Sequence, residues 1–368
     1  MNKRVVLAMS GGVDSSVAAY LLKKDGYEVT GLFMRMGDFE EETTAHSNSH
    51  GCCSFADSCD ARSVAESIGI PFYVLNFEKE FEKVVDYFCA EYTLGRTPNP
   101  CIICNQRLKF GKLMDFAKAL NADFIATGHY ARIEKVNGRY SLMKGVDKTK
   151  DQSYVLAQLD YEQLSKAIFP LGEINKEKVR SIAADLHLKV KDKAESQEIC
   201  FVPDDDYKKF IANRIKGEIK PGIIKDVNGN ILGEHKGIQF YTIGQRRGLG
   251  IALGKPIYVV DIDAENNEIT VGSDEDLLSK ELFATKLNWI SIEPPETPID
   301  VFAKIRYHHR PVRAIVYPCK DSVRVEFDEP QPAVTPGQAV VFYDKDKEDV
   351  VVGSGWIMKQ KMASNQGV

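Results

Sequence analysis

The chain has 368 residues, 43% of them hydrophobic and 27% charged, and its formal net charge at pH 7 is −5. Single hydrophobic cores stop growing beyond about 250–300 residues, so this length predicts two or three domains. The composition is that of an ordinary globular protein, and the acidic balance excludes a chain that binds polyanions over its whole surface. Any surface for a nucleic acid must therefore be local.

Apolar runs in the sequence are short. Residues 5–9 are followed by Ser10 and a glycine pair, and they are too few for the hydrophobic region of a signal peptide. No apolar stretch approaches the roughly 18–20 residues that span a bilayer. We therefore expect a cytoplasmic protein without membrane association. In that reducing compartment its 8 cysteines would be thiols, metal ligands or catalysts rather than a disulfide framework.

Residues 4 to about 130 alternate between strand-like and helix-like segments. The predicted strands are residues 5–9, 28–34, 71–77 and 123–129, and the predicted helices are residues 15–26, 61–69 and 107–121. This alternation predicts an α/β N-terminal domain with a Rossmann-like parallel sheet covered on both faces. Residues 36–54 are polar and aperiodic, which indicates a long functional loop.

The second half of the chain changes its period. Two more helices are predicted, at residues 161–172 and 182–190. After them the apolar residues no longer recur at helical spacing but at every second position, between turns rich in Pro and Gly. One predicted hairpin turns at residues 265–267. Short strands of this kind are typical of small β-rich domains and barrels. The expected segments are a catalytic domain at 1–205, a small central β-rich domain at 206–280, a C-terminal β-barrel at 281–360 and a disordered tail at 361–368.

The heptapeptide Ser-Gly-Gly-Val-Asp-Ser-Ser at residues 10–16 lies between the first predicted strand and the first predicted helix. Glycines let the backbone approach a phosphate, and a helix N-terminus offers N–H groups to an anion. Asp14 could cap the helix or hold Mg²⁺. The chain has neither G-x-x-x-x-G-K-[ST] nor G-x-G-x-x-G, which excludes the Walker and dinucleotide-binding loops.

The heptapeptide resembles instead the pyrophosphate loop of the adenylating ATP pyrophosphatases. That resemblance implies that the substrate nucleotide is ATP, with Mg²⁺. It implies nucleotide contacts at Ala8, Met9, Ser10, Gly11, Gly12, Val13, Asp14 and Ser15. Met34 and Gly128, with His129 beside it, end two other predicted strands, and open parallel sheets bind ligands at the carboxyl ends of their strands. We expect them to line the adenine and ribose pocket.

Cys101 and Cys104 lie just before the helix predicted to begin near Arg107. A helix N-terminus and nearby cations lower the pKa of a thiol, so both are candidates for reactive thiolates. Cys200 is the third candidate, with a buried inert thiol as the alternative. For Cys52, Cys53 and Cys59 we expect structural roles, with a zinc or redox site that includes His46 and His50 as the alternative; Cys89 and Cys319 are expected in the core.

A local basic stretch lies near the C-terminus. Residues 301–320 contain five basic residues and no acidic one: Lys304, Arg306, Arg310, Arg313 and Lys320. With Tyr307 and His308 between them, they indicate a surface for RNA phosphates and bases. The alternative is a strand edge protected from aggregation by its charges.

Seven ordered motifs, spread over nearly the whole chain, resemble those of the bacterial tRNA-specific 2-thiouridylases. They are SGGVDSS, GRTPNPCIICN, ATGHYAR, KDQSYVL, ESQEICF, YTIGQRRGLG and RYHHRP. The resemblance implies ATP-dependent 2-thiolation of the wobble uridine of tRNAs, those for Lys, Glu and Gln, with sulfur from a persulfide donor such as a cysteine desulfurase or a sulfur-relay protein. It also implies Cys104 as nucleophile, Cys200 as persulfide carrier and a transient Cys104–Cys200 disulfide. The implied tRNA contacts are Asn99, Pro100, Cys101, His129, Lys150, Asp151, Gln152, Arg306, Tyr307 and Gln338.

One position leaves the sulfur chemistry open. Many family members carry an acid where this chain has Cys101. An acid there would suit general acid–base catalysis beside a persulfide relay. Three thiolates, at Cys101, Cys104 and Cys200, could instead hold an iron-sulfur cluster that activates sulfide.

Two other function classes fit parts of the sequence. A pyrophosphate-loop ligase acting on a small metabolite would need the same loop but neither reactive thiols nor a basic C-terminal domain. A nucleotide sensor or RNA-binding module would bind without releasing pyrophosphate. Pyrophosphate release that depends on tRNA, on a metabolite alone, or on neither distinguishes the three.

Overall fold

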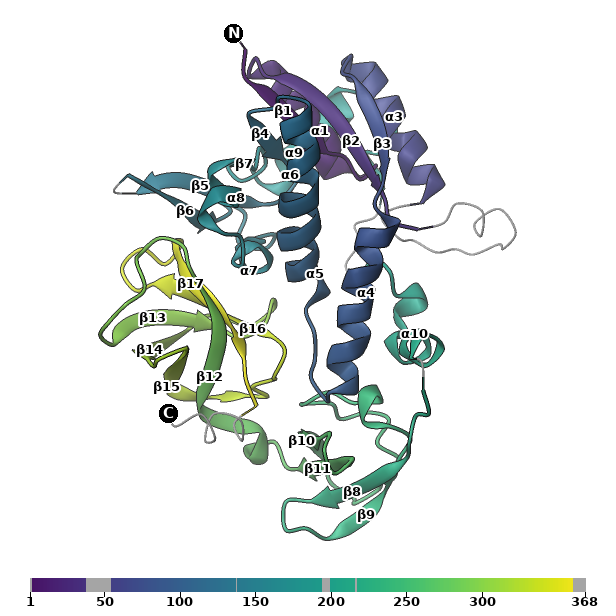
Figure 1. Cartoon of the computed structure of the whole chain (residues 1–368), viewed down its shortest axis with the longest axis vertical. Coiled ribbons are helices and arrows are strands. Elements are labelled where there is room, and N and C mark those ends of the chain that lie inside the picture. The colour runs from purple at the N-terminus through teal and green to yellow at the C-terminus, as the bar shows by residue number, and fades with distance from the viewer. Residues whose placement is uncertain (1, 38–53, 137, 194–198, 216, 360–368) are drawn as a thin grey trace. The chain divides into compact units, whose positions relative to one another are not determined.

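The computed structural model describes residues 2–37, 54–136, 138–193, 199–215 and 217–359 (Figure 1). The polar segment predicted as a loop, with Cys52, Cys53, His46 and His50, and the predicted tail at 361–368 lie almost entirely outside these residues. The chain divides into two compact units, which are described separately. Unit 1 comprises Met1–Val84, Cys101–Asp205 and Asp349–Val351; unit 2 comprises Val85–Pro100, Asp206–Glu348 and Val352–Val368.

Unit 1 is built on a parallel sheet of five strands in the order β3-β2-β1-β4-β7. The strands are β1 Arg4–Ala8, β2 Glu28–Arg35, β3 Phe72–Asn76, β4 Phe124–Ala126 and β7 Ala167–Ile168. The consecutive residues Val5, Val6 and Leu7 are all buried, as expected for a strand covered on both faces. Because β1 pairs with β2 on one side and β4 on the other, the strand order reverses beside β1. The predicted Rossmann-like sheet is confirmed.

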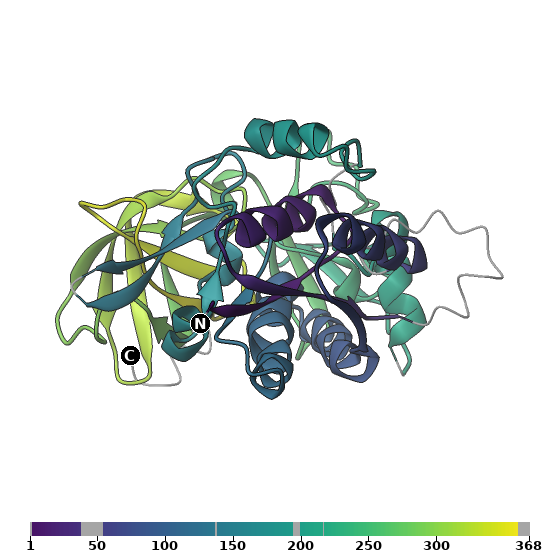
Figure 2. The ribbon, with the colours of Figure 1, turned by 90° about the horizontal axis from the view of Figure 1, so that it is seen from above.

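Helices cover both faces of this sheet (Figure 2). On one face lie α1 Val13–Lys24, α3 Phe55–Ile68 and α9 Lys176–Asp185, whose apolar residues share a core with β1 and β2. On the other lies α6 Leu113–Ala119. Ser54 and Asp57 form a capping box at the start of α3, and Gly69 ends that helix in the left-handed conformation. Local sequence thus sets where α3 begins and ends.

A continuous helical rod carries two of the candidate cysteines, Cys101 and Cys104. It runs through α5 Pro100–Ile103, the π-helix η1 Cys104–Lys112 and α6. The sequence-based start near Arg107 was therefore wrong: the helix begins at Pro100. Proline is favoured at the first helical position, where its missing N–H costs nothing, so this proline opens the helix rather than ending a preceding loop.

The remaining elements of unit 1 were predicted less completely. The antiparallel hairpin of β5 Ala131–Val136 and β6 Arg139–Lys144 was not predicted. Residues 161–172, predicted as one helix, form only α8 Tyr161–Ser165 before β7 begins, because Pro170 and Gly172 do not allow the helix to continue. The other short helices are α7 Ser153–Leu156 and the 3₁₀ turn η2 Pro203–Asp205.

Unit 2 contains a four-stranded sheet and a closed barrel of six strands. The sheet has the order β10-β11-β8-β9, with β8 Gly222–Asp226, β9 Ile231–His235, β10 Tyr258–Asp263 and β11 Glu268–Gly272. The barrel has the order β12-β15-β14-β13-β16-β17, with β12 Leu278–Trp289, β13 Ile299–Lys304, β14 Val312–Pro318, β15 Ser322–Pro332, β16 Ala339–Asp344 and β17 Val351–Ile357. Both confirm the predicted β-rich C-terminal half, and β10 and β11 form the predicted hairpin.

Each part of unit 2 has its own core. Val316, Val325 and Phe342 belong to the barrel core, and Val259 and Ile269 to that of the four-stranded sheet. The helical elements that belong to unit 2 or enter it are α4 Glu78–Thr93, α10 Tyr207–Arg214, η3 Ile238–Phe240 and η4 Glu275–Leu277. Within the described ranges, no helix combines the length and apolar character needed to cross a bilayer.

Candidate functional site

The loop between β1 and α1 lies where the strand order of the sheet reverses. Ser15 Oγ accepts a hydrogen bond from Ser10 N at 3.2 Å and donates to Gly12 O at 3.2 Å; Ser16 Oγ donates to the same carbonyl at 2.8 Å. The N-cap of α1 is Gly12, and it makes no side-chain capping bond. The hydroxyls therefore shape the loop from within, and the start of the helix stays suited to an external anion.

Two glycines bring neighbouring loops into close contact. Gly11 has φ +71°, and a Cβ there would lie 2.3 Å from Asp57 O. A Cβ on Gly128, which follows β4, would lie 2.9 Å from Ser15 N. The chain therefore needs glycine at both positions. Residues 10–12, between β1 and α1, are called the Ser-Gly loop from here on. This loop and Gly128 were predicted from distant parts of the sequence to share a nucleotide site, and they meet at the carboxyl ends of adjacent strands.

Asp14 makes an ion pair that the sequence did not indicate. Lys176 Nζ lies 2.7 Å from Asp14 Oδ1 and 2.8 Å from Oδ2, and Tyr130 donates its hydroxyl to Oδ1 at 2.7 Å. The suggestion that Asp14 caps α1 is wrong, because the N-cap is Gly12. The available signal was a lysine directly after Asn175, the N-cap of α9, where a helix dipole disfavours a cation.

Lys193 is a second lysine that contacts the loop. Its Nζ donates to Gly11 O at 3.1 Å, to Asp57 Oδ1 at 2.5 Å and to Asp60 Oδ2 at 2.7 Å. Burial alone would lower the pKa of Lys193, but the hydrogen bonds to Asp57 and Asp60 outweigh it and raise the pKa. Lys193 therefore stays charged and joins the loop to the start of α3.

His129 lies in the interior rather than on the surface. It is 8% exposed; its Nδ1 is 2.6 Å from Thr127 Oγ1, and its ring lies 6.4 Å and 6.0 Å, between centroids, from those of Phe110 and Phe169. Burial, and then the charge of Lys109, place the pKa of His129 well below its usual 6.5. The imidazole is neutral at neutral pH, and a contact between it and tRNA stays a prediction.

The other predicted nucleotide residues lie around the same strand ends. Met34 is buried near the end of β2, opposite Leu75 of β3. Met9 and Val13 are also buried and belong to the core beneath the loop. Ala8 is half-buried at the end of β1. The structure thus gathers the predicted nucleotide residues at one edge of the sheet.

Two of the three candidate cysteines, Cys101 and Cys104, lie on the helical rod. Cys101 is exposed in the first turn of α5, and Cys104, half-buried, begins the π-helix. Side-chain amides hold this π-helix in place: Asn105 Nδ2 donates to Val155 O at 3.0 Å, and Gln106 Nε2 to Gln158 O at 3.0 Å. π-Helical turns are rare and are frequently found at functional sites. Cys200 is half-buried, and the ring of the next residue, Phe201, packs on Phe81.

The arrangement of the cysteines bears on whether they could bind a metal. Among the residues that the structure describes, no three Cys, His, Asp or Glu side chains gather in a way that could hold a metal ion. Cys101, Cys104 and Cys200 thus do not form a ready-made cluster site. Cys59 is exposed on α3, and Cys89 and Cys319, predicted in the core, are only half-buried. Cys319 lies outside the strands, in the turn between β14 and β15, where its N–H donates to Ser322 O.

Several predicted RNA contacts hold backbone in place. Gln338 Nε2 donates to Thr97 O at 3.1 Å and to Pro98 O at 3.0 Å, which fixes the chain just before Asn99 and Pro100. Asp151, 8% exposed, accepts from Gly145 N and from both N and Oγ of Ser153. Gln152 exchanges two hydrogen bonds with the backbone of Tyr130, and Lys150 beside it is half-buried.

The basic stretch forms β13, a turn and β14. Arg310, Arg313 and Lys320 are exposed, and Arg306 is half-exposed, with its Nη2 3.1 Å from Pro332 O. Tyr307 and His308 pack edge to face, 4.8 Å between centroids. Lys304, included in the predicted surface, is only 9% exposed, and its Nζ lies over the Tyr307 ring, 5.6 Å from the ring centroid. It does not belong to the exposed basic surface.

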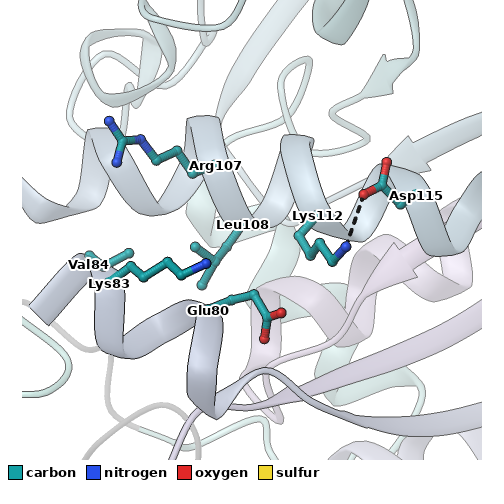
Figure 3. Close-up of a pocket in the computed structure, with 7 residues that line it drawn as sticks. All are labelled: Glu80, Lys83, Val84, Arg107, Leu108, Lys112 and Asp115. Atoms are coloured by element: carbon teal, nitrogen blue, oxygen red, sulfur yellow. Dashed lines mark hydrogen bonds and ion pairs between the residues drawn. The ribbon is translucent and has the colours of Figure 1, made fainter.

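A cavity of about 260 Å³ lies elsewhere in unit 1 (Figure 3). Its lining residues come from α4, η1 and α6: Glu80, Lys83, Val84, Arg107, Leu108, Lys112 and Asp115. Figure 3 shows Lys112 turned toward Asp115, 3.3 Å away, and Arg107 directed away from the other side chains. The lining charges are mixed and do not converge, so we place the chemistry at the Ser-Gly loop.

Family models match the whole described architecture. A model described as tRNA methyl transferase HUP domain matches residues 3–204, one described as tRNA methyl transferase PRC-barrel domain matches 208–273, and one described as Aminomethyltransferase beta-barrel domain matches 279–357. The matched segments follow the parallel sheet, the four-stranded sheet and the closed barrel in order.

Curated relatives are similar over their full length. The tRNA-specific 2-thiouridylase MnmA 2 of Thermoanaerobacter sp. (strain X514) is 52% identical over 364 residues, which is 98% of this chain and 99% of the relative. The tRNA-specific 2-thiouridylase MnmA of Natranaerobius thermophilus is 53% identical over 98% of both chains. MnmA 1 of Clostridium botulinum (strain Loch Maree) is 51% identical over 98% of this chain and 100% of the relative. With the loop, the cysteines and the three matched segments, this similarity establishes that the chain belongs to the family of tRNA-specific 2-thiouridylases.

Proposed function

We propose that the chain is a tRNA-uridine 2-sulfurtransferase, which converts the wobble uridine of tRNA to 2-thiouridine with ATP and a cysteine persulfide. The observation that carries the proposal is the meeting of the Ser-Gly loop with Gly128 where the strand order reverses, in a chain of this family. We assign catalysis to a domain at residues 1–205 and RNA binding to a β-barrel domain at 281–360. The small domain at 206–280 connects the two in the sequence.

ATP fits the loop chemically. The N-terminus of α1, the glycines and the hydroxyl of Ser10 suit a polyphosphate. The nearby carboxylates of Asp14, Asp57 and Asp60 already pair with lysines. Mg²⁺ is commonly held by one or two carboxylates together with substrate phosphates, so we expect it to arrive with ATP rather than to occupy a site built from protein alone.

Adenylation solves a leaving-group problem. The C2 oxygen of uridine is a poor leaving group, so that oxygen attacks the α-phosphate of ATP, pyrophosphate departs and the oxygen becomes part of an AMP leaving group. The terminal sulfur of a persulfide on Cys200 then attacks C2, and AMP leaves. Cys104 thiolate attacks the Cys200 sulfur, which breaks the S–S bond, releases the thiocarbonyl and forms a Cys104–Cys200 disulfide. A dithiol reductant restores both thiols.

The cluster alternative finds less support in this chain. Its three ligands would be Cys101, Cys104 and Cys200, and these are not gathered as a metal site among the described residues. We derive no step through a cluster. In the relay, Cys101 at the start of the rod is a positioning residue beside the nucleophile.

The proposed partners are tRNAs for Lys, Glu and Gln and a persulfide donor, such as a cysteine desulfurase or a sulfur-relay protein. A wobble base can be splayed out of its single-stranded loop and read on its edges. We place its contact at Asn99 to Cys101, which Gln338 helps to position through residues 97 and 98.

Arg306→Ala and Arg310→Ala test the basic surface of the barrel. Each should weaken tRNA binding and reduce the slope of log K against log salt by roughly 0.7–0.9 for each phosphate that the side chain neutralises. Arg324→Ala is the matched control: Arg324 pairs with Glu281 and Glu326 on the same barrel, and its removal should leave the slope unchanged. Filter binding across a salt series measures the slope for all three variants. If all three slopes equal that of the wild type, the basic surface does not bind tRNA and is only a charged strand edge.

Mass spectrometry of tRNA nucleosides tests the function itself. Incubation of the chain with unmodified tRNA, ATP and a persulfide donor should yield 2-thiouridine, and omission of ATP should prevent it. Pyrophosphate release should depend on tRNA. Release with a small metabolite alone, without thiolated nucleoside, would favour the ligase instead.

A further inference from the structure

Lys176 holds a buried ammonium against the Ser-Gly loop. The residue is 7% exposed, and its Nζ contacts both carboxylate oxygens of Asp14, at 2.7 and 2.8 Å. Tyr130 completes the group, with its hydroxyl 2.7 Å from Asp14 Oδ1 and its ring centroid 5.7 Å from Nζ. Removing a lysine ammonium from water costs free energy, so a buried ammonium needs a specific partner in place of its hydration. The carboxylate of Asp14, in the first turn of α1, is such a partner.

The position of Lys176 in its own helix is unfavourable. It is the first residue of α9, after the N-cap Asn175, and the partial positive charge of a helix N-terminus disfavours a cation there. Glu177, the next residue in the first turn, carries the negative charge that a helix N-terminus favours. Residues that contradict local preference usually serve a contact elsewhere in the fold, and that contact is Asp14, 162 positions earlier in the chain.

Asp14 explains why a cation is needed. It lies in the first turn of α1, beside the loop proposed to hold the phosphates, and its side chain is 30% exposed. The helix dipole attracts a polyphosphate, but this carboxylate repels it. At an effective dielectric constant of about 20, one unit charge several Å away changes a binding constant by roughly tenfold or more.

We propose that Lys176 is a binding residue of the nucleotide site, whose ammonium offsets Asp14 so that the triphosphate of a nucleotide can enter the loop between β1 and α1. This inference rests on the proposed use of ATP and names the pair of residues on which affinity for the phosphates depends. Adenosine, which has no phosphate, is expected to be insensitive to the pair.

Isothermal titration of the full chain with α,β-methylene-ATP and with adenosine, in EDTA, tests the inference. Lys176→Met should weaken the ATP analogue roughly tenfold or more and leave adenosine unchanged. Asp14→Asn should tighten the analogue, since it removes the repelling charge. The double variant Lys176→Met/Asp14→Asn should bind the analogue more tightly than Lys176→Met, because the two charges act on one ligand. Lys178→Met, an exposed lysine on the same helix, is the matched control.

Each contrary outcome has one meaning. Wild-type affinity in Lys176→Met, a parallel loss of adenosine binding, or a double variant as weak as Lys176→Met would overturn the inference. If Lys176→Met does not fold, as judged by circular dichroism, Asp14→Asn decides: weaker binding of the analogue overturns the charge offset. A wild-type chain that binds adenosine but not the analogue would instead refute the proposed ATP site itself.

Discussion

Replacement of Cys200 or Cys104 by serine is expected to lower the rate of tRNA thiolation by roughly 10³-fold or more. Losses of this size are seen when a covalent nucleophile is removed. The two variants should fail at different steps. Without Cys200 there is no carrier, so no persulfide sulfur appears at this position and no thiolated nucleoside forms. Without Cys104, Cys200 still takes up sulfur and the base is still adenylated, but release of the thiocarbonyl stalls.

The stalled species makes the second variant diagnostic. Cys104→Ser should accumulate a tRNA–Cys200 disulfide adduct, visible on a non-reducing gel, and an added dithiol should release 2-thiouridine from it. Cys59→Ser, which removes an exposed thiol on α3, is the control and should retain activity. Multiple turnovers by Cys104→Ser without added thiol would contradict the relay.

Cys101→Ser separates the relay from the cluster. In the relay Cys101 positions its neighbours, so the variant should be slower but active. In the cluster alternative it is a ligand equal to the other two. Anaerobic reconstitution with iron and sulfide, followed by iron analysis and visible absorption, makes the comparison. Iron that activity requires, and that all three single variants lose alike, would show that the relay is wrong.

Gly11→Ala is expected to eliminate tRNA-dependent pyrophosphate release while tRNA affinity remains near that of the wild type. The alanine Cβ would lie 2.3 Å from Asp57 O, at a φ of +71°, so the loop and the start of α3 cannot both keep their places. Gly26→Ala is the control. It has a similar φ of +84° but nothing within 4 Å of its Cβ, and should cost roughly 1 kcal/mol of stability without loss of activity.

Pyrophosphate release, tRNA binding and thermal unfolding should be measured on both variants. The expected result is a loss of the first in Gly11→Ala alone. If Gly11→Ala released pyrophosphate at the wild-type rate, the loop would not hold the phosphates. If tRNA binding fell to the same degree as pyrophosphate release, the loop would be part of the RNA site.

The elements that could be predicted are those whose sequence patterns lie within a few consecutive residues. Apolar continuity in Val5–Leu7 marks a strand buried on both faces, and the heptapeptide after it marks an anion loop, because glycines and a helix start are local requirements of phosphate binding. The change from helical spacing to a period of two marks the β-rich half. Strand pairing itself was implied only through the βαβ alternation.

The tertiary structure decided which distant residues meet. Lys176 and Lys193 reach Asp14 and Gly11 across 162 and 182 positions, and no local motif announces such pairs, because they depend on how α9 and the chain after it pack against α1 and α3. The burial of His129 between Phe110 and Phe169 depends in the same way on packing across elements. The loop and the cysteines could be predicted from sequence because their chemistry depends on neighbouring residues. Which charged side chains surround the loop depends on tertiary packing alone.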